Sequence, residues 1–417
     1  MEGSPCEEAP GARRSRPPKV CIVTVDPSGD AAGGALARAL TAHGVVELWG
    51  AGGPALREAG VQLLADTLGW SSLGLVEVVR AFPRAWTGSF RLRRQVADLA
   101  PDLLVVIDCG TFNVRFAGAV RRLREQPVLY YIPPRSWSRR WRVGRLARVA
   151  DYIAAPFPWN VEGDDGTGRV RFVGHPAADL LAALPDQAEA RRQMGLAPDR
   201  LTLGLLPGSR ELELRVHLPI LLDTARRLRA GFPGLQLVLS RARGASRARL
   251  EQAAQRAGLE DLRIVDGAPL PMRASDVALV CLGTATLEGA VVGCPMITFY
   301  RGTWLQGIEY LIKPPRTSYY AMPNIIAGER ILTEVAQWEV TPERLAAEAA
   351  RLLRDPAARQ ELAARLAQVA QQLGGQGASD RAAQAVWDAL EGRWHVGSGA
   401  ASATRAEGSA EAVRVSP

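Results

Sequence analysis

The sequence predicts an α/β protein built from two doubly wound, Rossmann-like domains that face each other. Its 417 residues exceed the ~250–300 residues that one hydrophobic core usually supports. Short, unbroken apolar runs recur along the chain, as in strands of a parallel sheet that helices cover on both faces. This alternation of strands and helical stretches starts again after about residue 180, which favours a second domain of the same kind.

The first series of predicted strands consists of Val20–Val25, Val45–Gly50, Leu103–Asp108 and Val128–Ile132. The second series consists of Leu201–Leu206, Leu235–Ser240, Leu262–Val265, Val277–Leu282 and Pro295–Tyr300. After Pro342 the chain has alanine, leucine and glutamate at helical spacing, which predicts a helical C-terminal segment.

These patterns predict four segments. Residues 1–18 and 396–417 are polar or rich in small residues, and we expect a disordered leader and a disordered tail. Residues 19–180 form the first predicted domain and residues 181–395 the second, with the connection near Gly174–Asp186. The leader lacks the apolar stretch of a secretory signal, and no apolar run reaches the ~18–20 residues of a membrane span.

The composition limits the partners. The net charge of +8 favours anionic ligands such as nucleotides and phosphosugars. Only Lys19 and Lys313 are lysines, so the charge is also explained by the arginine bias of a GC-rich genome. No arginine-rich helix interleaved with aromatics occurs, which disfavours nucleic acid. Five cysteines without a C-x-x-C pair, and no cluster with metal-ligand spacing, disfavour a metal site and fit a reducing cytoplasm.

Open α/β sheets bind ligands beyond the carboxyl ends of their strands. The first such turn contains Asp26, Ser28, Gly29 and Asp30 before a helix. Its glycines let backbone N–H groups approach a ligand, and a helix N-terminus favours anions. Ser28 and Asp30 could equally be helix caps.

Asp108 ends another buried strand and is followed by a segment that contains Asn113. A carboxylate in this position could be the general base that deprotonates an acceptor hydroxyl. The alternative is that Asp108 caps the next helix. His175, in a Gly-His-Pro turn after a strand, is more simply explained as a capping or structural histidine.

The second half offers two turns for a nucleotide. Gly208, Ser209 and Arg210, followed by Glu213, could present amides and a guanidinium to a diphosphate, although a tight turn with a surface arginine is the alternative. In the other turn a strand ends at Gly283 and Thr284, and a helix begins that could hold a diphosphate at its N-terminus. Glu288 lies one helical turn further on, where it could accept hydrogen bonds from ribose hydroxyls.

Taken together, these segments resemble the lipid-A-disaccharide synthase family from about Val20 to about Leu390. The matching pieces are DPSGD, GAGGPALREAG, LGLVEVV, PDLLVVIDCGTFN, YIPPRSW, RFVGHPAAD, LLPGSRELE, ASDVALVCLGTATLE, CPMITFYR and MPNIIAG. The resemblance implies a GT-B fold and an inverting transfer without metal or cofactor. It implies UDP-2,3-diacylglucosamine as donor, 2,3-diacylglucosamine 1-phosphate as acceptor, and the β-1,6-linked lipid A disaccharide and UDP as products.

The resemblance also implies roles for residues. Asp108 matches the family's proposed base. The UDP-sugar would be held by Gly208, Ser209, Arg210, Glu213, Gly283, Thr284, Glu288 and Asn324, and the acceptor side of the cleft would contain Asp26, Ser28, Gly29, Asp30 and Asn113. Family members lie on the cytoplasmic face of the inner membrane as peripheral proteins. We expect the same here through residues 68–94, where Trp70, Leu73, Leu75, Val79, Phe82, Trp86 and Phe90 accompany five arginines. The alternative for this segment is an amphipathic core helix.

This chain departs from the family pattern at five places. Thr111 replaces an acid, Leu282 and Arg135 each replace a serine, and in the first turn Asp26 replaces a glutamate and Val25 a glycine. These departures leave open a different acceptor, or a diverged protein that binds UDP-sugar or lipid without turnover. A UDP-sugar 2-epimerase shares the architecture but needs several acids and a histidine around the sugar, for which the sequence offers few candidates. A homodimer is compatible with the sequence.

Overall fold

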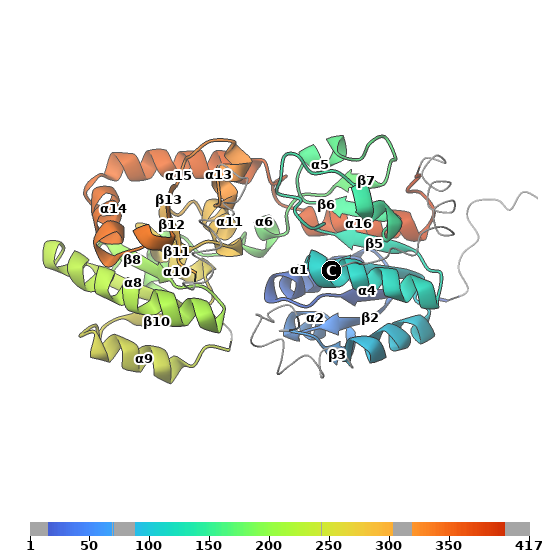
Figure 1. The fold of residues 1–417 in the computed structure, drawn as a ribbon, viewed down its shortest axis with the longest axis horizontal. Helices are drawn as coiled ribbons and strands as arrows, with labels where there is room; N and C mark the ends of the chain where they lie inside the picture. Colours follow the sequence, from blue (N-terminus) through green and yellow to red (C-terminus); the bar gives the residue numbers. More distant parts are fainter. Residues whose placement is uncertain (1–15, 69, 71–87, 243, 303–318, 397–417) are drawn as a thin grey trace, which may run out of the picture.

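The computed structural model describes residues 16–68, 70, 88–242, 244–302 and 319–396. Two parallel sheets, each covered by helices, lie side by side along the long axis of the molecule (Figure 1). The first sheet has seven strands in the order β3-β2-β1-β4-β5-β6-β7, and the second has six in the order β10-β9-β8-β11-β12-β13. The predicted α/β fold with two doubly wound halves is confirmed.

The strands of the first sheet are β1 (Lys19–Val23), β2 (Glu47–Gly52), β3 (Gln62–Asp66), β4 (Leu103–Ile107), β5 (Val128–Tyr131), β6 (Tyr152–Ala155) and β7 (Val170–Phe172). Its helices are α1 (Pro27–His43), α2 (Pro54–Glu58), helical residues 88–99, α4 (Gly110–Leu123), η1 (Gly144–Arg148), α5 (Trp159–Glu162) and α6 (Ala177–Leu180).

The strands of the second sheet are β8 (Thr202–Leu206), β9 (Gln236–Arg241), β10 (Arg263–Asp266), β11 (Val277–Cys281), β12 (Met296–Tyr300) and β13 (Thr333–Ala336). The helices after α6 are α7 (Gln187–Gln193), α8 (Glu211–Gly231), α9 (Arg247–Arg256), α10 (Pro269–Ala274), α11 (Thr284–Val291), α13 (Met322–Ala327), η2 (Gln337–Glu339), α14 (Pro342–Arg354), α15 (Pro356–Gln371) and α16 (Ala378–Leu390).

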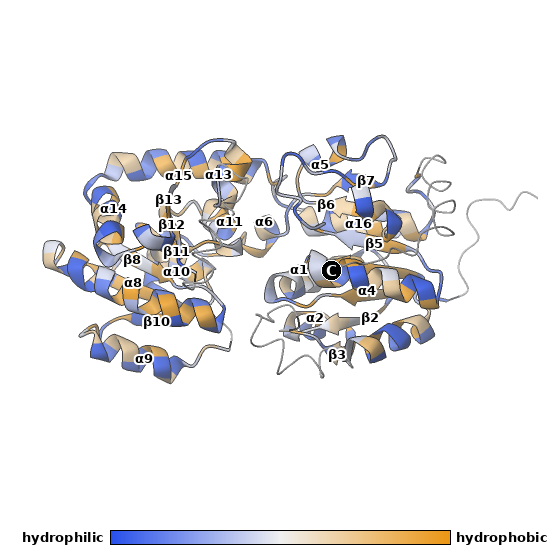
Figure 2. Cartoon of the chain, in the orientation of Figure 1, coloured by the Kyte–Doolittle hydropathy of each residue, from blue (hydrophilic) through white to orange (hydrophobic). Residues whose placement is uncertain are grey.

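The central strands are buried on both faces, as their unbroken apolar runs predict. Every residue of β4, β8 and β11 is buried. The covering helices carry polar as well as apolar residues along their length (Figure 2). Such helices bury one face against a sheet and leave the other in water. Central strands of this kind hold the turns at their carboxyl ends in place, and those turns contain most of the predicted site residues.

The last helix returns to the first half. In Figure 1, α16 lies beside β5 and β6 of the first half, whereas α14 and α15 lie on the second half. Its Ala382, Ala383 and Val386 are buried in one apolar cluster with Leu36 and Leu40 of α1. Residues 378–396 therefore complete the first core, although the sequence analysis placed them in the second domain. Nothing in the amphipathic pattern of a helix says which of two sheets it will cover.

The chain ends of the described part are attached to the first half. Arg16 forms an ion pair with Asp102 (3.2 Å), and Val396 packs against the cluster that contains α16. The predictions of a disordered leader and a disordered tail otherwise concern residues 1–15 and 397–417, which lie outside the described residues.

Candidate active site

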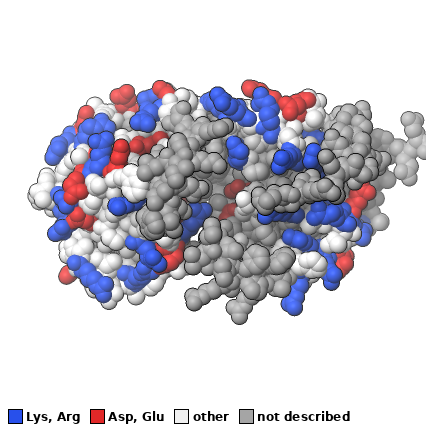
Figure 3. Space-filling model, viewed as in Figure 1, with Lys and Arg blue, Asp and Glu red and all other residues white. Residues whose placement is uncertain are grey.

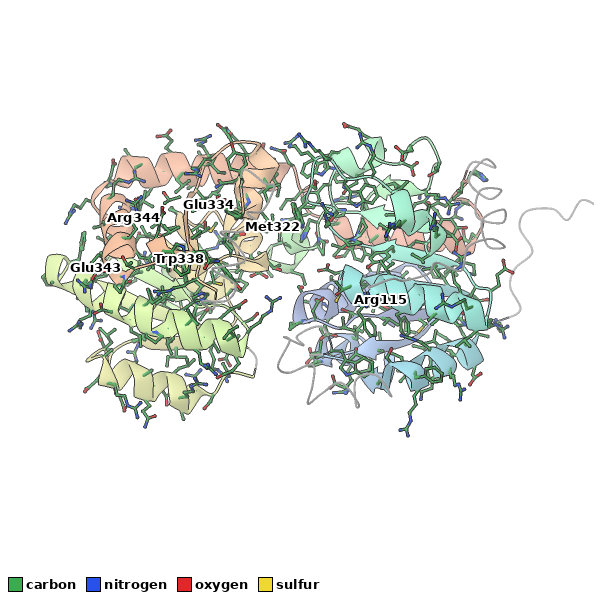
Figure 4. The ribbon with its side chains drawn as sticks, in the orientation of Figure 1. Arg115, Met322, Glu334, Trp338, Glu343 and Arg344 are labelled. Carbon is green, nitrogen blue, oxygen red and sulfur yellow. The ribbon has the colours of Figure 1, made fainter. Side chains whose placement is uncertain are left out.

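A cavity of about 870 Å³, counting the space at its mouth, lies where the two halves meet. Its polar lining residues are Ser28, Asp108, Arg135, Ser136, His175, Thr284 and Glu288, and its apolar ones include Trp137, Phe157, Leu180, Leu181 and Met322. Met322 lies on the edge of the second half that faces the first (Figure 4). On the face of the molecule seen in Figure 3, lysine and arginine side chains are spread over both halves. The cavity brings together turns that are more than 250 residues apart in sequence, such as those of Ser28 and Glu288.

Asp108 lies at the carboxyl end of β4 in an unusual backbone conformation. Its φ is 53° and that of Cys109 is 37°, both in the left-handed region, where strain is common at functional sites. Its carboxylate accepts a hydrogen bond from the N–H of Cys109 (2.8 Å). The N-cap residue of α4 is Cys109, which makes no side-chain capping bond. In the described part of the chain, the side chain of Asp108 therefore does not cap α4. Asp108 is one of the residues that line the cavity.

Two buried side chains hold this turn. The Tyr130 hydroxyl donates to the carbonyl oxygen of Asp108 (2.7 Å). Asn113 Nδ2 donates to the carbonyl oxygens of Ile107 (2.7 Å) and Asp108 (3.0 Å). Asn113 therefore acts on the backbone that carries Asp108, and its side chain is fully buried.

The ionisation of Asp108 is perturbed. Burial of the carboxyl, and then the negative charge of Asp26, raise its pKa to about 6, against the lowering effect of the hydrogen bond from Cys109. A carboxylate with a pKa near 6 is ionised at neutral pH and still basic enough to accept a proton in a transition state.

The first turn divides its polar residues between the cavity and the protein interior. Asp26 caps α1 by accepting hydrogen bonds from Gly29 N–H (2.6 Å) and the Ser28 hydroxyl (2.9 Å). Ser28 lines the cavity. A Cβ on Gly29 would lie 2.1 Å from Thr24 Oγ1, so this close approach requires glycine.

Asp30 points away from the cavity, at the start of α2. Its carboxylate accepts hydrogen bonds from the N–H groups of Gly53 (2.7 Å), Ala55 (2.9 Å) and Leu56 (3.3 Å). Asp30 is 2 % exposed. One of the two alternatives predicted Asp30 to be a helix cap. It is a cap, but of α2 and not of α1, the helix in which it lies.

In the second half, Glu213 orders the turn that carries Arg210. Glu213 Oε2 accepts from the N–H groups of Ser209 (2.9 Å) and Arg210 (3.1 Å). Gly208 has a φ of 107°, and a Cβ there would lie 2.4 Å from Glu213 Oε2. The Arg210 side chain pairs with Glu213 at 3.3 Å and remains 67 % exposed, against 10 % for Glu213. Arg210 is thus exposed, although it is not among the residues that line the cavity, whereas Glu213 is used by the turn.

Helix α11 begins at the cavity. Gly283 is its N-cap residue, and Thr284 and Glu288 line the cavity one turn apart. Burial raises the pKa of Glu288. The free N–H groups of this helix terminus favour an anionic group, so a diphosphate and a sugar or ribose hydroxyl could be bound by the same helix.

Asn324 is buried and occupied by protein partners. Its Oδ1 accepts from Ile331 N–H (2.9 Å) and Leu332 N–H (2.8 Å), and its Nδ2 donates to Leu332 O (3.0 Å) and Glu334 Oε1 (2.9 Å). Glu334, labelled in Figure 4, also accepts from the N–H groups of Tyr320 and Ala321. These bonds hold the start of α13, whose Met322 lines the cavity.

Sequence reasoning did not place His175 in the site. It lies between β7 and α6, its Nδ1 accepts from Ala177 N–H (3.2 Å), and its ring lines the cavity. The capping role predicted for it is therefore present. The signal available in the sequence was its position directly after a strand, in the turn Gly174-His175-Pro176. Two of the residues that differ from the family pattern can also be placed. Arg135 lines the cavity and has a φ of 59°. Thr111 is exposed at the start of α4.

Most of the segment expected to contact a membrane, residues 69 and 71–87, lies outside the described residues. Of its described part, Leu92 is fully buried and Phe90 is 52 % exposed under the guanidinium of Arg94. Within the described ranges, no helix is long and apolar enough to cross a membrane. The same ranges contain no group of three or more histidine, cysteine, aspartate or glutamate side chains suited to a metal ion.

Two parallel α/β halves with a cavity at the carboxyl ends of their central strands are the architecture of GT-B glycosyltransferases and related epimerases. Among solved structures, a putative UDP-N-acetylglucosamine 2-epimerase from Listeria monocytogenes superposes with a TM-score of 0.62 at 14 % identity, covering 90 % of this chain and 97 % of that one. The S. aureus MnaA–UDP structure gives 0.60 at 14 % identity, covering 89 % and 97 %. The glycotransferase of kitacinnamycin gives 0.56 at 18 % identity, covering 90 % and 100 %. Identities this low establish the fold alone.

Sequence comparison gives the family. The model of the family described as lipid-A-disaccharide synthetase matches residues 20–388. A lipid-A-disaccharide synthase of Geobacter metallireducens is 37 % identical over 377 residues, 89 % of this chain and 97 % of the relative. Another, from Anaeromyxobacter dehalogenans, is 39 % identical over 349 residues, 82 % and 89 % of the two chains. The chain belongs to the lipid-A-disaccharide synthase family and is a glycosyltransferase of GT-B fold, so the resemblance found in the motifs is confirmed.

Proposed function

We propose that this protein transfers 2,3-diacylglucosamine from UDP to the hydroxyl of 2,3-diacylglucosamine 1-phosphate with inversion. The products are the β-1,6-linked lipid A disaccharide and UDP. The observation that carries this proposal is that Asp108 from the first half and Thr284 and Glu288 from the second line the same cavity. The names of the relatives support the reaction, and the UDP in one structure of the same fold supports the nucleotide.

In this proposal the second half binds the sugar nucleotide. The N-terminus of α11 and the accessible guanidinium of Arg210 stabilise the negative charge that develops on the diphosphate as it leaves. Glu288 accepts hydrogen bonds from hydroxyls of the donor. Glu213 and Asn324 contribute indirectly, because their polar atoms hold the turn of Arg210 and the start of α13.

The first half supplies the base. Asp108 takes the proton of the acceptor hydroxyl while the hydroxyl oxygen forms a bond to the anomeric carbon of the donor sugar. The bond from that carbon to UDP breaks at the same time, and its electron pair leaves with the phosphate oxygen of UDP. A base in this role is worth about 10²–10⁴-fold in rate. Ser28 contacts the acceptor, while Asp26, Gly29, Asp30 and Asn113 shape the turns around it.

The test is to incubate the purified protein with UDP-2,3-diacylglucosamine and 2,3-diacylglucosamine 1-phosphate and to measure disaccharide and UDP by mass spectrometry. We expect both products, and we expect Asp108→Asn to bind UDP normally while losing most turnover. Free epimerised sugar would indicate the epimerase alternative, and binding without any product would indicate a diverged binder. Near wild-type turnover by Asp108→Asn would place the base elsewhere.

We further propose that residues 68–94 attach the protein to the anionic cytoplasmic face of the inner membrane. The support is the mixture of aromatic and aliphatic residues with five arginines in this segment. Liposomes that contain anionic lipid should retain the protein at low salt and release it at high salt. Equal retention by neutral liposomes, or none by either, would contradict this assignment.

A further inference from the structure

We propose that His175 binds the sugar nucleotide directly, by donating a hydrogen bond from its Nε2–H to an oxygen of that substrate. The inference rests on the proposed function, because it assumes that the cavity holds a UDP-sugar. It adds to the site a neutral donor that lies on the connection between the two halves.

The hydrogen bonds of His175 determine its tautomer. Nδ1 lies 3.2 Å from the backbone nitrogen of Ala177, which is a donor, so Nδ1 must present a lone pair. A neutral imidazole carries one proton, which is then on Nε2. Burial supports this state, because it lowers the pKa of His175 to about 4 and keeps the ring uncharged at neutral pH. His175 therefore presents an N–H donor and no positive charge.

The ring is held in place from several sides. The backbone N–H of His175 donates to Leu373 O (2.8 Å), on the segment that leads to α16. The ring packs against Phe157 with centroids 5.9 Å apart, and Pro176 follows at the start of α6. A side chain fixed in this way loses little entropy when it binds a ligand.

The neighbours of His175 include residues packed against α11, the helix proposed to bind the sugar nucleotide. Helix α6, which follows His175 directly, packs against α11 as well as α1. Phe157 belongs to the same apolar cluster as Leu287 of α11. His175 thus lines the cavity beside the helix whose N-terminus is suited to a diphosphate. None of the described residues accepts a hydrogen bond from Nε2, so this donor is available to an oxygen of the diphosphate or of the sugar.

Two substitutions separate the donor role of His175 from its capping role. In His175→Asn, the amide oxygen can still accept from Ala177 N–H, but no donor reaches the position of Nε2. In His175→Gln, the longer side chain can place an amide N–H near that position and loses the cap. If His175 only caps α6, His175→Asn should retain more UDP-sugar affinity than His175→Gln. If Nε2–H donates to the substrate, His175→Gln should retain more.

The experiment measures the dissociation constants of UDP and of UDP-2,3-diacylglucosamine by calorimetry without acceptor, for the wild type and both variants. We expect His175→Asn to bind the UDP-sugar about 3- to 10-fold more weakly than His175→Gln, as for loss of one neutral hydrogen bond. A parallel loss for UDP alone places the contact on the diphosphate, and unchanged UDP affinity places it on the sugar. Equal or tighter UDP-sugar binding by His175→Asn overturns the proposal.

Binding and turnover are independent readouts here. If the wild type binds UDP-sugar but forms no disaccharide, the proposed function fails while the calorimetric comparison still decides the role of His175. Thermal unfolding of both variants checks that they are folded at the temperature of the titration. Should either variant be unfolded, His175→Ala with added imidazole replaces it: recovery of UDP-sugar affinity by imidazole supports the donor role, and no recovery contradicts it.

Discussion

Burial of the Asp108 carboxyl and the negative charge of Asp26 together raise the pKa of Asp108 to about 6. The two acids come from neighbouring strands, since β1 and β4 pair in parallel and both end at the cavity edge of the sheet. Asp26 is held at the start of α1 by Gly29 and Ser28. The first sheet therefore sets the basicity of Asp108 through the turn that follows a different strand.

The pH dependence of turnover should report this pKa. The proposed base acts in its ionised form, so the rate should rise about tenfold per pH unit below 6 and level off above it. Asp26→Asn removes a negative charge while asparagine can still cap α1. We expect this variant to shift the midpoint of the pH–rate profile to lower pH. A midpoint that stays in place would show that the charge of Asp26 does not act on the catalytic group.

Asp108→Asn should stabilise the fold at high pH. The folded-state pKa of Asp108 is raised above its unfolded value, so the ionised carboxylate costs stability above pH 6, and this cost disappears below about pH 4. Two pKa units correspond to at most about 3 kcal/mol. Urea unfolding at pH 8 should show the variant to be more stable than the wild type, and the difference should vanish near pH 4. Lower stability of Asp108→Asn at pH 8 would argue against a buried, ionised Asp108.

Arg210→Ala should weaken UDP binding by about 1.5–3 kcal/mol, as for loss of a charged hydrogen bond. The turn itself should survive, because Glu213 holds it through backbone N–H groups. Arg215, also on α8 and exposed, provides the matched control, and Arg215→Ala should leave UDP affinity unchanged. Titration calorimetry with UDP distinguishes these results, and equal affinities for both variants would remove Arg210 from the nucleotide site.

Asp30→Ala should destabilise the first half by about 2–3 kcal/mol. Three backbone N–H groups at the start of α2 would lose a buried, charged acceptor. Asp30→Asn keeps one acceptor oxygen and should lose less. Urea unfolding measures both effects, with UDP affinity as the control that the second half is intact. If Asp30→Ala were as stable as the wild type but lost turnover, Asp30 would have to act on the substrate.

Much of the fold could be predicted because short apolar runs in the local sequence identify its main strands. All nine predicted strands correspond to β1, β2, β4, β5 and β8–β12, and the central ones are buried on both faces. The strands that were not predicted, β3, β6, β7 and β13, have three to five residues each, and most of them lie at sheet edges. The edge strand β3, for example, has no fully buried residue, so it lacks the unbroken apolar run that marks the central strands.

The sequence by itself determined the family, the α/β class and the turns that could carry chemistry, because glycines, strand-end acids and apolar runs act over a few residues. The tertiary structure decided which side chains of those turns face the cavity. Asp30 and Asn324 are directed at backbone groups of other segments, whereas Asp108 and Glu288 line the cavity from opposite halves. It also decided that α16 covers the first sheet and that His175 enters the site. These outcomes depend on contacts between residues far apart in the chain. Which group accepts a hydrogen bond, and which surface covers an apolar helix face, is decided only when the chain packs.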